Sequence, residues 1–396
     1  MSTARPGHCS RMRVGTPQSQ RTYPTGGELL AQYLEPLTER TVLRDHVQTS
    51  SRVMGISRAG YDKVRTRGRE TAPFTIGYRN GAGMLSLEAD AVIDVSGTWS
   101  SPNPAGANGL AAIGEDEAQD AIAYAMPDVL GKERARYAGK RVAVLGAGHS
   151  AIGTLIDLVR LSDQVPGTQP VWLLRGENPE KAFGGHANDK LPARGELGAT
   201  FAQLVRDGRL TLQAGFQVTH ITKTDAGLRV SAGSACCGRH LVADELIVAT
   251  GFRSDSSFAR ELRLSLDPAL ECPPALAPLI DPNEHSCGTV RPHGARELAQ
   301  PEPGFYIAGM KSYGRAPTFL MLTGYEQVRS IVADIAGDHE AAERVELELP
   351  ETGVCSGSPL DDDGAASAGC CGSEPAADAP CCTPQRDTRA AVGSCG

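Results

Sequence analysis

Between Glu28 and Val95 the pattern of hydrophobic positions changes from a helical period to strands. From Glu28 onward, leucines and one tyrosine recur at a spacing that places them on one face of a short helix. Further along, Phe74–Tyr78 and Met84–Leu87 read as the two strands of a hairpin. The Asn80-Gly81 pair between them is expected to supply the positive φ of a tight turn. This segment is predicted to form a small antiparallel sheet.

A second module begins at Arg141, where strand and helix patterns alternate. Val142–Leu145 is a short apolar run, Ser150–Leu161 has its apolar residues on one helix face, and Val171–Leu174 is a further apolar run. A strand, a helix and a strand within about 35 residues have the length of one βαβ unit, which implies a parallel sheet. The other elements predicted here are helix Glu196–Arg206 and strands Leu210–Leu212, Phe216–Ile221 and Glu245–Ala249.

Three short apolar runs end in a similar way. Val92–Gly97 and Leu246–Gly251 each finish in Ser-Gly or Thr-Gly, and Gly304–Gly309 finishes in Ala-Gly. In an open α/β sheet, ligands lie beyond the carboxyl ends of the strands, where a glycine lets a ligand approach the backbone. The pattern therefore predicts three strand ends that face a ligand. A helix from about Pro317 to Ala336 should follow the third.

The charge pattern excludes several kinds of partner. The 396 residues carry a net charge of −8, and their basic residues form no extended block, so nucleic acid is not expected to bind. No run approaches the roughly 18 to 20 apolar residues that span a bilayer. Residues 1–22 also lack the apolar centre of a secretory signal. We therefore expect a cytoplasmic protein that acts on a small molecule, with no membrane partner.

The two ends of the chain differ in composition from the rest. Residues 351–396 are rich in Gly, Ala, Ser, Pro and Asp and contain few larger aliphatic side chains. Such a segment cannot offset its chain entropy by burial, so a disordered tail is predicted. Residues 1–22 contain four arginines and no apolar period, and they are predicted to be unstructured.

A nucleotide-binding pattern opens the first helix of the second module. Gly146, Gly148, His149, Ser150 and Ala151 form a Gly-x-Gly-x-x-Ala sequence that follows a strand and begins a helix. The glycines allow a tight turn and the close approach of a pyrophosphate. Its charge is met by the free N–H groups and the dipole of the helix N-terminus. We predict a dinucleotide site here.

The end of the next strand bears on the choice between NAD and NADP. Arg175 stands where NAD-binding proteins usually carry an acid for the ribose hydroxyls, and an arginine there can hold the 2′-phosphate of NADP. NADPH is therefore the expected cofactor. In the alternative reading, Arg175 is a solvated strand-end charge and Glu177 is the ribose acid.

The chain also resembles a known family. Its similarity runs from about Tyr23 to Cys355, and the matching segments are Tyr23–Gly27, Val92–Pro104, Arg141–Ser150, Asp281–Gly294 and Gly304–Arg329. They resemble bacterial FAD-dependent oxidoreductases that are often encoded beside arsenic-resistance genes, and more widely the flavin-containing monooxygenases. The resemblance implies an NADPH domain inserted into an FAD domain, with reducing equivalents that pass from nicotinamide to flavin.

The resemblance also implies roles for single residues. Gly146, Gly148 and Ser150 would take the NADP pyrophosphate. Gly97, Gly251 and Gly309 would lie at the crossings between the domains and beside the flavin.

The chain departs from this family in two places. Such proteins open with a strand and a Gly-rich helix N-terminus for the FAD diphosphate, and nothing before Tyr23 resembles it, so the FAD site is in doubt. Met310 follows Gly309 where many flavoprotein reductases place an Asp on the flavin ribityl chain. Lys311 is expected either to meet a phosphate or to be exposed.

These patterns lead to one fold prediction. We predict an α/β protein with two interleaved dinucleotide-binding (Rossmann-like) domains, of which the FAD domain is incomplete, and a disordered C-terminal tail. The predicted segments are a lead of residues 1–22, the FAD domain in residues 23–137 and 253–350, the inserted NADP domain in residues 138–252, and the tail in residues 351–396.

Two groups of residues could bind a metal or metalloid. His285, Cys287 and His293 share a Pro-punctuated loop and could ligate a metal or do acid–base work, or the loop could be ordered by hydrogen bonds alone. In the tail, Cys370-Cys371 and Cys381-Cys382 could converge on arsenite or a soft metal, because thiolates suit soft centres. The alternative is a solvated tail whose cysteines bind nothing.

The function predicted from the sequence is that of an NADPH-linked flavoprotein oxidoreductase or monooxygenase, with a place in arsenic or metalloid resistance. Its catalytic residues are not assigned. The alternative is a non-enzymatic protein that binds NADP or sequesters metalloids through its thiols.

Overall fold

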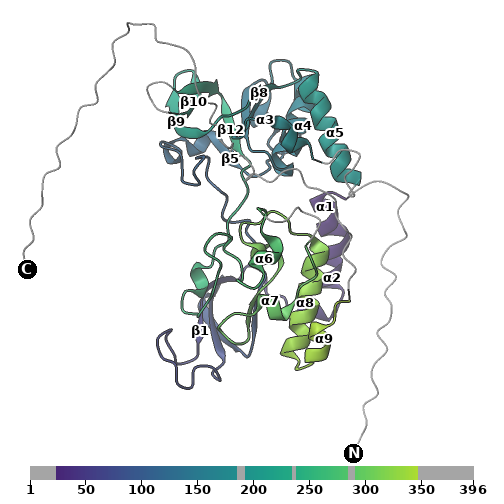
Figure 1. Cartoon of the computed structure of the whole chain (residues 1–396). Coiled ribbons are helices and arrows are strands. Elements are labelled where there is room, and N and C mark those ends of the chain that lie inside the picture. Colours follow the sequence, from purple (N-terminus) through teal and green to yellow (C-terminus); the bar gives the residue numbers. More distant parts are fainter. Residues whose placement is uncertain (1–23, 185–191, 234–237, 284–289, 347–396) are drawn as a thin grey trace, which may run out of the picture. The chain divides into compact units, whose positions relative to one another are not determined.

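The computed structural model of the chain describes residues 24–184, 192–233, 238–283 and 290–346 (Figure 1). The lead of residues 1–22 and the tail of residues 351–396, both predicted to be unstructured, lie outside the described residues. None of the helices described is long and apolar enough to cross a membrane.

The module around the predicted nucleotide turn is built on a five-stranded parallel sheet of order β5-β12-β6-β7-β8. Its strands are β5 Ile122–Tyr124, β6 Arg141–Leu145, β7 Gln169–Leu173, β8 Thr211–Gln213 and β12 Glu245–Val248. The three central strands are almost entirely buried, which explains their unbroken apolar sequences. Edge strand β5 precedes residue 138, so the sheet draws on residues earlier in the chain than the start expected for the inserted domain.

Each face of this sheet is covered by a different layer. Helices α4 His149–Gln164 and α5 Pro192–Arg206 cover one face, and the core between them and the sheet includes Trp172 and Phe201. An antiparallel sheet of β9 Val218–Thr224, β10 Gly227–Ala232 and β11 Arg239–Ala243 covers the other. The sequence patterns predicted the βαβ unit, α5, β8 and β9, but they missed β5, β10 and β11.

The second module is assembled from residues on both sides of the first. Strand β4 Val92–Asp94 pairs in parallel with β13 Phe305–Ile307, although more than 200 residues separate them along the chain. Beside them is the predicted antiparallel sheet, with strands β1 Arg52–Arg58, β2 Phe74–Asn80 and β3 Gly83–Ala89. The two modules are thus interleaved, as predicted.

The hairpin turn between β2 and β3 is shorter than expected. Asn80 pairs with Gly83, which leaves a two-residue turn, and the positive φ of +110° belongs to Gly83 rather than to Asn80 or Gly81. Asn80 contributes differently, because its side-chain oxygen accepts a hydrogen bond from Ala82 N at 2.8 Å. The sequence prediction identified the hairpin but assigned the positive φ angle to the wrong residues.

The predicted helix after Glu28 is present in the second module, whereas the last long helix, α8, starts later than predicted. The predicted N-terminal helix is present as α1 Gly26–Leu29, the π-helical turn Leu30–Leu34 and α2 Glu35–Glu39, and it begins with a capping box of Thr25 and Glu28. The remaining helices are α3 Arg134–Tyr137 in the first module and α6 Ala277–Ile280, α7 Ala295–Leu298, α8 Met321–Ile335 and α9 His339–Glu343 in the second. The short 3-10 helices are Val42–Asp45, Asp116–Ala121, Pro179–Phe183, Ser257–Ala259 and Gly309–Tyr313.

Helix α8 starts four residues later than the predicted Pro317. Leu320 is extended, with φ −118° and ψ 146°, and the ring of Phe319 packs edge-on against Tyr313. This aromatic contact holds the segment before the helix away from the helical conformation, so the proline lies outside α8.

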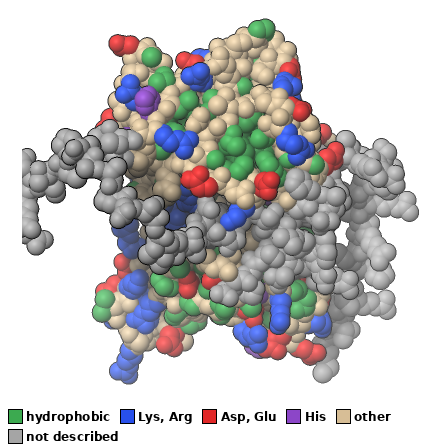
Figure 2. Space-filling view, turned by 45° about the horizontal axis from the view of Figure 1, so that its top comes forward, with side chains coloured by type: hydrophobic (Ala, Val, Ile, Leu, Met, Phe, Trp, Pro, Cys, Tyr) green, Lys and Arg blue, Asp and Glu red, His purple; other side chains and the backbone are tan. Residues whose placement is uncertain are grey.

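The apolar residues of α8 lie on its exposed side. They recur at intervals of four and three residues and are 38–54% exposed: Met321, Tyr325, Val328, Val332 and Ile335. The buried side consists mostly of polar residues: Thr323, Glu326, Gln327, Ser330 and Ile331. A helix that packs on one core usually shows the reverse arrangement. Figure 2 shows one face of the whole molecule, on which hydrophobic side chains gather among charged ones.

A buried group of three charges joins β1 to the segment before β13. The Glu302 carboxylate, which is 1% exposed, lies 2.8 Å from Arg58 Nε and 2.5 Å from Arg69 Nη1. It also accepts a hydrogen bond from Arg263 N at 3.0 Å. Burial acts to raise the pKa of Glu302, but the hydrogen bonds from Arg263, Arg58 and Arg69 outweigh it and lower the pKa.

Replacing Glu302 should therefore destabilise the second module. The substitution Glu302→Gln leaves two buried guanidinium groups without a counter-charge, which costs about 3–5 kcal/mol. We expect a lower midpoint of urea unfolding, with little change for the control Glu261→Gln, whose carboxylate is exposed. Because the folded pKa of Glu302 is depressed, the stabilisation should be present above the ordinary glutamate pKa and be lost as the pH falls through the folded value. Equal midpoints for the two variants would show that the group contributes little.

Candidate functional site

The turn between β6 and α4 has the shape that a dinucleotide site requires. Gly146 has a φ of +143°, and a Cβ atom at this residue would lie 2.4 Å from the carbonyl oxygen of Ala249. A side chain is therefore excluded by both backbone conformation and space. Ala151 is completely buried in the first turn of α4, where the pattern requires a small residue so that helix and strand can pack closely.

The second glycine leaves open space at the helix N-terminus. Gly148 is the N-cap of α4, and a Cβ atom at this residue would meet no atom within 4 Å. Among the described residues, no side-chain hydrogen bond caps the helix at Gly148, and in the first turn His149 is exposed and Ser150 half-buried. A helix of 16 residues directs its first N–H groups and its dipole toward this space, which suits a diphosphate.

A buried tryptophan donates a hydrogen bond to the backbone of the turn between β6 and α4. Trp172 in β7 donates a hydrogen bond from Nε1 to the carbonyl oxygen of Gly146 at 2.7 Å, and its ring meets Phe201 edge-on at 4.9 Å. The sequence predictions did not assign a role to Trp172. The only feature of the sequence that could have indicated this role is an indole side chain, which has one N–H donor, in the strand next to the glycine turn.

The two candidates for cofactor selection lie on the same loop after β7, but their side chains face different neighbouring loops. Arg175 is exposed just beyond β7, and its Nη1 donates to the carbonyl oxygen of Ala107 at 3.4 Å. The carboxylate of Glu177 lies over Gly215, where a Cβ atom would come within 2.3 Å of Oε1. Glu177 is thus directed toward the loop after β8, and Arg175 toward the loop of residues 105–110.

All three strand-end glycines have a left-handed backbone. Their φ angles are +68° at Gly97, +90° at Gly251 and +69° at Gly309. A Cβ atom would meet nothing within 4 Å at Gly97 or Gly309. The strands therefore end in turns that favour glycine, two of which have open space beside them.

The two segments that cross between the modules are joined to each other. Asn103 N donates to Gly251 O at 2.9 Å, and the Asn103 side chain donates to Thr250 O at 2.9 Å. In return, the backbone N–H of Arg253 donates to Ser101 O at 2.8 Å. The Arg253 side chain donates from Nε to the side-chain oxygen of Asn103, also at 2.8 Å. These contacts fix the loop after β12 beside the loop after β4.

His293 is part of a buried hydrogen-bond network rather than an exposed site. Its Nδ1 lies 2.9 Å from the Arg291 carbonyl oxygen, and its Nε2 lies 2.9 Å from the side-chain nitrogen of Gln327. The oxygen of that amide accepts a hydrogen bond from Gly309 N at 2.7 Å. Burial lowers the pKa of His293, so the neutral ring is favoured. For this residue the hydrogen-bonding alternative fits, whereas His285 and Cys287 lie outside the described residues.

One of the two expectations for Lys311, an exposed side chain, was wrong. The side chain is buried, and its Nζ lies 2.7 Å from Asp94 Oδ2, 2.6 Å from the Asp255 carbonyl oxygen and 4.5 Å from the centre of the Phe258 ring. An ion pair in this position ties the end of β4 to the turn after β13. Only the long-range pairing of these strands brings the two residues together.

No metal site is found in the part of the chain that the structure describes. The tail pairs Cys370-Cys371 and Cys381-Cys382 lie outside it. Cys272 is buried, and burial raises the pKa of its thiol to about 12, which makes it unreactive as a thiolate.

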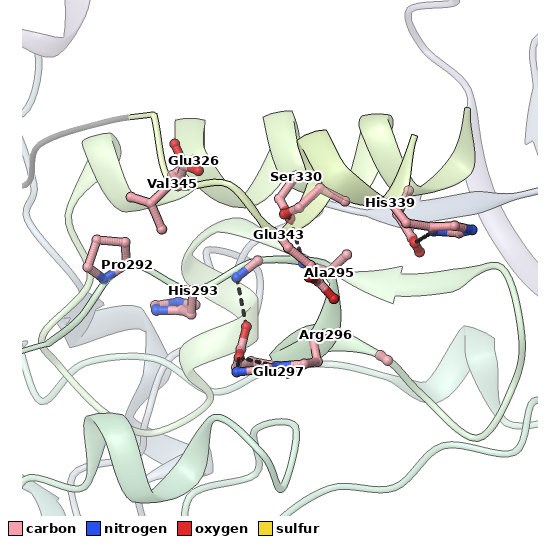
Figure 3. Close-up of a pocket in the computed structure, with 14 residues that line it drawn as sticks. Pro292, His293, Ala295, Arg296, Glu297, Glu326, Ser330, His339, Glu343 and Val345 are labelled. Carbon is pink, nitrogen blue, oxygen red and sulfur yellow. Dashed lines mark hydrogen bonds and ion pairs between the residues drawn. The ribbon is translucent and has the colours of Figure 1, made fainter. Parts of the chain in front are cut away.

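A cavity of about 510 Å³ lies among α7, α8 and α9 (Figure 3). Two of its acidic side chains have partners of their own: Glu297 accepts from Gly294 N at 3.0 Å, and Glu326 pairs with Arg329 at 2.6 Å. Ser330 accepts from Ala295 N at 2.9 Å and so joins α8 to α7. These groups hold the helices together, and we assign no cofactor to the cavity.

The comparisons with known proteins concern the fold. No family model matches the chain, and no curated protein matches its sequence. Among solved structures it is similar to the bacillithiol disulfide reductase Bdr (YpdA) from Bacillus cereus, with 17% identity, a TM-score of 0.56 and 82% of each chain covered. The same reductase from Staphylococcus aureus gives 17% identity, a TM-score of 0.52 and coverage of 80% of this chain and 79% of that one.

A third similar structure is DfoA from Erwinia amylovora, described as a cadaverine monooxygenase and bound to FAD. It has 13% identity and a TM-score of 0.50, and the match covers 77% of this chain and 72% of that one. At these identities the likeness shows the fold alone. The predicted fold class, an α/β protein with two interleaved dinucleotide-binding-type modules, is confirmed.

The position of Arg175 makes cofactor selection testable. A guanidinium paired with the 2′-phosphate should add about 1.5–3 kcal/mol to NADPH binding. We expect Arg175→Ala to weaken NADPH about tenfold to a hundredfold and to leave NADH nearly unchanged in a fluorescence titration. The control Arg229→Ala removes an exposed arginine of β10 and should change neither. Equal losses for the two cofactors would reject the assignment of Arg175.

Proposed function

We propose that the chain is the NADPH-binding component of a flavoprotein oxidoreductase or monooxygenase that acts on a small molecule. The observation that carries this proposal is the turn at Gly146, which combines an excluded side chain, open space at Gly148 and an uncapped helix N-terminus. The fold that the chain shares with a disulfide reductase and with an FAD-bound monooxygenase supports it.

The described residues can hold NADP(H) with a clear division of roles. Gly148 and the first turn of α4 would receive the diphosphate, and Arg175 the 2′-phosphate. Ala151 and Trp172 would act indirectly by keeping the helix and the turn in place. The cofactor, once bound, supplies a hydride.

The second module fits FAD poorly in the residues that are described. Neither β4 nor β13 leads through a glycine turn directly into a long helix, so no cradle for a second diphosphate is present among them. The N–H of Gly309 already donates to Gln327, and Lys311 is held by Asp94. We therefore derive no reaction step through FAD. This observation favours a second candidate, a protein that binds NADP(H) without a flavin of its own.

Cofactor content distinguishes these possibilities. We expect the purified chain to bind about one NADPH and to contain far less than one FAD, because within the described parts of the chain only the first module offers a diphosphate site. Flavin absorbance per mole of protein and NADPH fluorescence are the two measurements. A preparation with close to one FAD per chain would contradict our reading of the second module. Absence of NADPH binding would contradict the proposed function itself.

We extend the proposal to arsenic or metalloid resistance on the sequence alone. Its basis is the family resemblance and the paired thiols Cys370-Cys371 and Cys381-Cys382, which suit arsenite or another soft centre.

Deletion of residues 356–396 tests this extension. Loss of the thiols should abolish tight arsenite binding, whereas the thermal unfolding of the remainder should not change, because the tail is predicted to add nothing to the core. The full-length chain with all four cysteines changed to serine is the matched control and should lose binding equally. Unchanged arsenite stoichiometry in either variant would reject the tail as the binding site.

A further inference from the structure

Trp99 is a large apolar side chain in an unusual position. It is 76% exposed, and its ring stacks on Phe252 with 5.8 Å between centroids and an angle of 26° between planes. The other tryptophan of the chain, Trp172, is completely buried. An exposed indole that is supported by a second ring presents a flat aromatic surface, which is a common feature of sites that bind planar ligands.

This aromatic pair lies close to the proposed diphosphate site. Phe252 follows Ala249 by three residues, and the Ala249 carbonyl lies against Gly146 at the start of the turn. Three residues span at most about 10 Å. The contacts of Asn103 with Thr250 and Gly251 fix the backbone on both sides, so the pair is held beside the turn.

The strand order sets the direction in which a dinucleotide would extend. The sheet has β7 on one side of β6 and β12 on the other. With the 2′-phosphate at Arg175 beyond β7 and the diphosphate at Gly148, the nicotinamide half must extend toward β12. The chain that continues from β12 leads directly to Phe252.

We propose that Trp99 and Phe252 form the stacking surface for the nicotinamide ring. This inference rests on the proposed function and adds the position of the reactive ring. The oxidised ring is cationic and the reduced ring is neutral, and the face of an indole attracts cations. The surface should therefore bind NADP⁺ more tightly than a purely apolar patch would, and it should favour NADP⁺ over NADPH.

Ligand-induced changes in tryptophan fluorescence test this arrangement. NADP⁺ should quench the emission of Trp99, which we measure as the difference between the wild type and Trp99→Phe. Adenosine 2′,5′-bisphosphate carries the adenosine and the 2′-phosphate but no nicotinamide, so it should bind without quenching Trp99. Equal quenching by the two ligands, or none by NADP⁺, would overturn the stacking surface. Failure of adenosine 2′,5′-bisphosphate to bind would overturn the proposed NADP site as well.

Affinities of matched variants provide a second readout. Trp99→Leu should weaken NADP⁺ about tenfold, weaken NADPH less, and leave adenosine 2′,5′-bisphosphate unchanged in calorimetric titrations. Trp99→Phe retains an aromatic face and should restore most of the affinity. Val64→Ala removes another highly exposed apolar side chain, located between β1 and β2, and should have no effect. Equal losses for NADP⁺ and adenosine 2′,5′-bisphosphate in Trp99→Leu would reject the proposal.

Discussion

The close approach of Gly146 to the carbonyl of Ala249 is the constraint on which the candidate site depends. Because residue 146 has no side chain, the ends of β6 and β12 can lie against each other, and the chain passes from β6 to α4 through only three residues, 146–148. Trp172 binds the Gly146 carbonyl from the neighbouring strand and so fixes the peptide plane. Helix α4 consequently begins directly after its N-cap Gly148, with its N-terminus facing open space, and a diphosphate could bind there without any side-chain charge.

The two modules are stabilised in different ways. The first has a continuous apolar core on both faces of its parallel sheet, as expected for strands buried on two sides. In the second, buried ion pairs connect segments that are distant in sequence, namely Glu302 with Arg58 and Lys311 with Asp94. Removing one partner of such a pair would leave an uncompensated buried charge, so these segments depend on one another. The buried side of α8 is likewise mostly polar, so polar contacts also connect this helix to the rest of the second module.

The loops after β4 and β12, where the chain crosses between the modules, lie together and carry the aromatic pair of Trp99 and Phe252. Hydrogen bonds between Asn103, Thr250 and Arg253 keep the loops after β4 and β12 together, although the five-stranded sheet lies between them in sequence. The stacked rings of Trp99 and Phe252 come from these same two loops. A dinucleotide that binds at Gly148 would therefore reach a surface to which both crossings contribute.

Local sequence patterns determined the parts of the protein that depend on neighbours in the chain. The Gly146–Ala151 turn, the βαβ unit and the glycine strand ends were all predicted, because each is encoded by residues a few positions apart. The tertiary structure alone decided the burial of Lys311 and the pairing of Trp99 with Phe252. Arg58 and Glu302 are 244 residues apart in the sequence, and their contact follows from strand pairing that no local period records. Short patterns specify elements, whereas long-range packing decides which of their side chains meet.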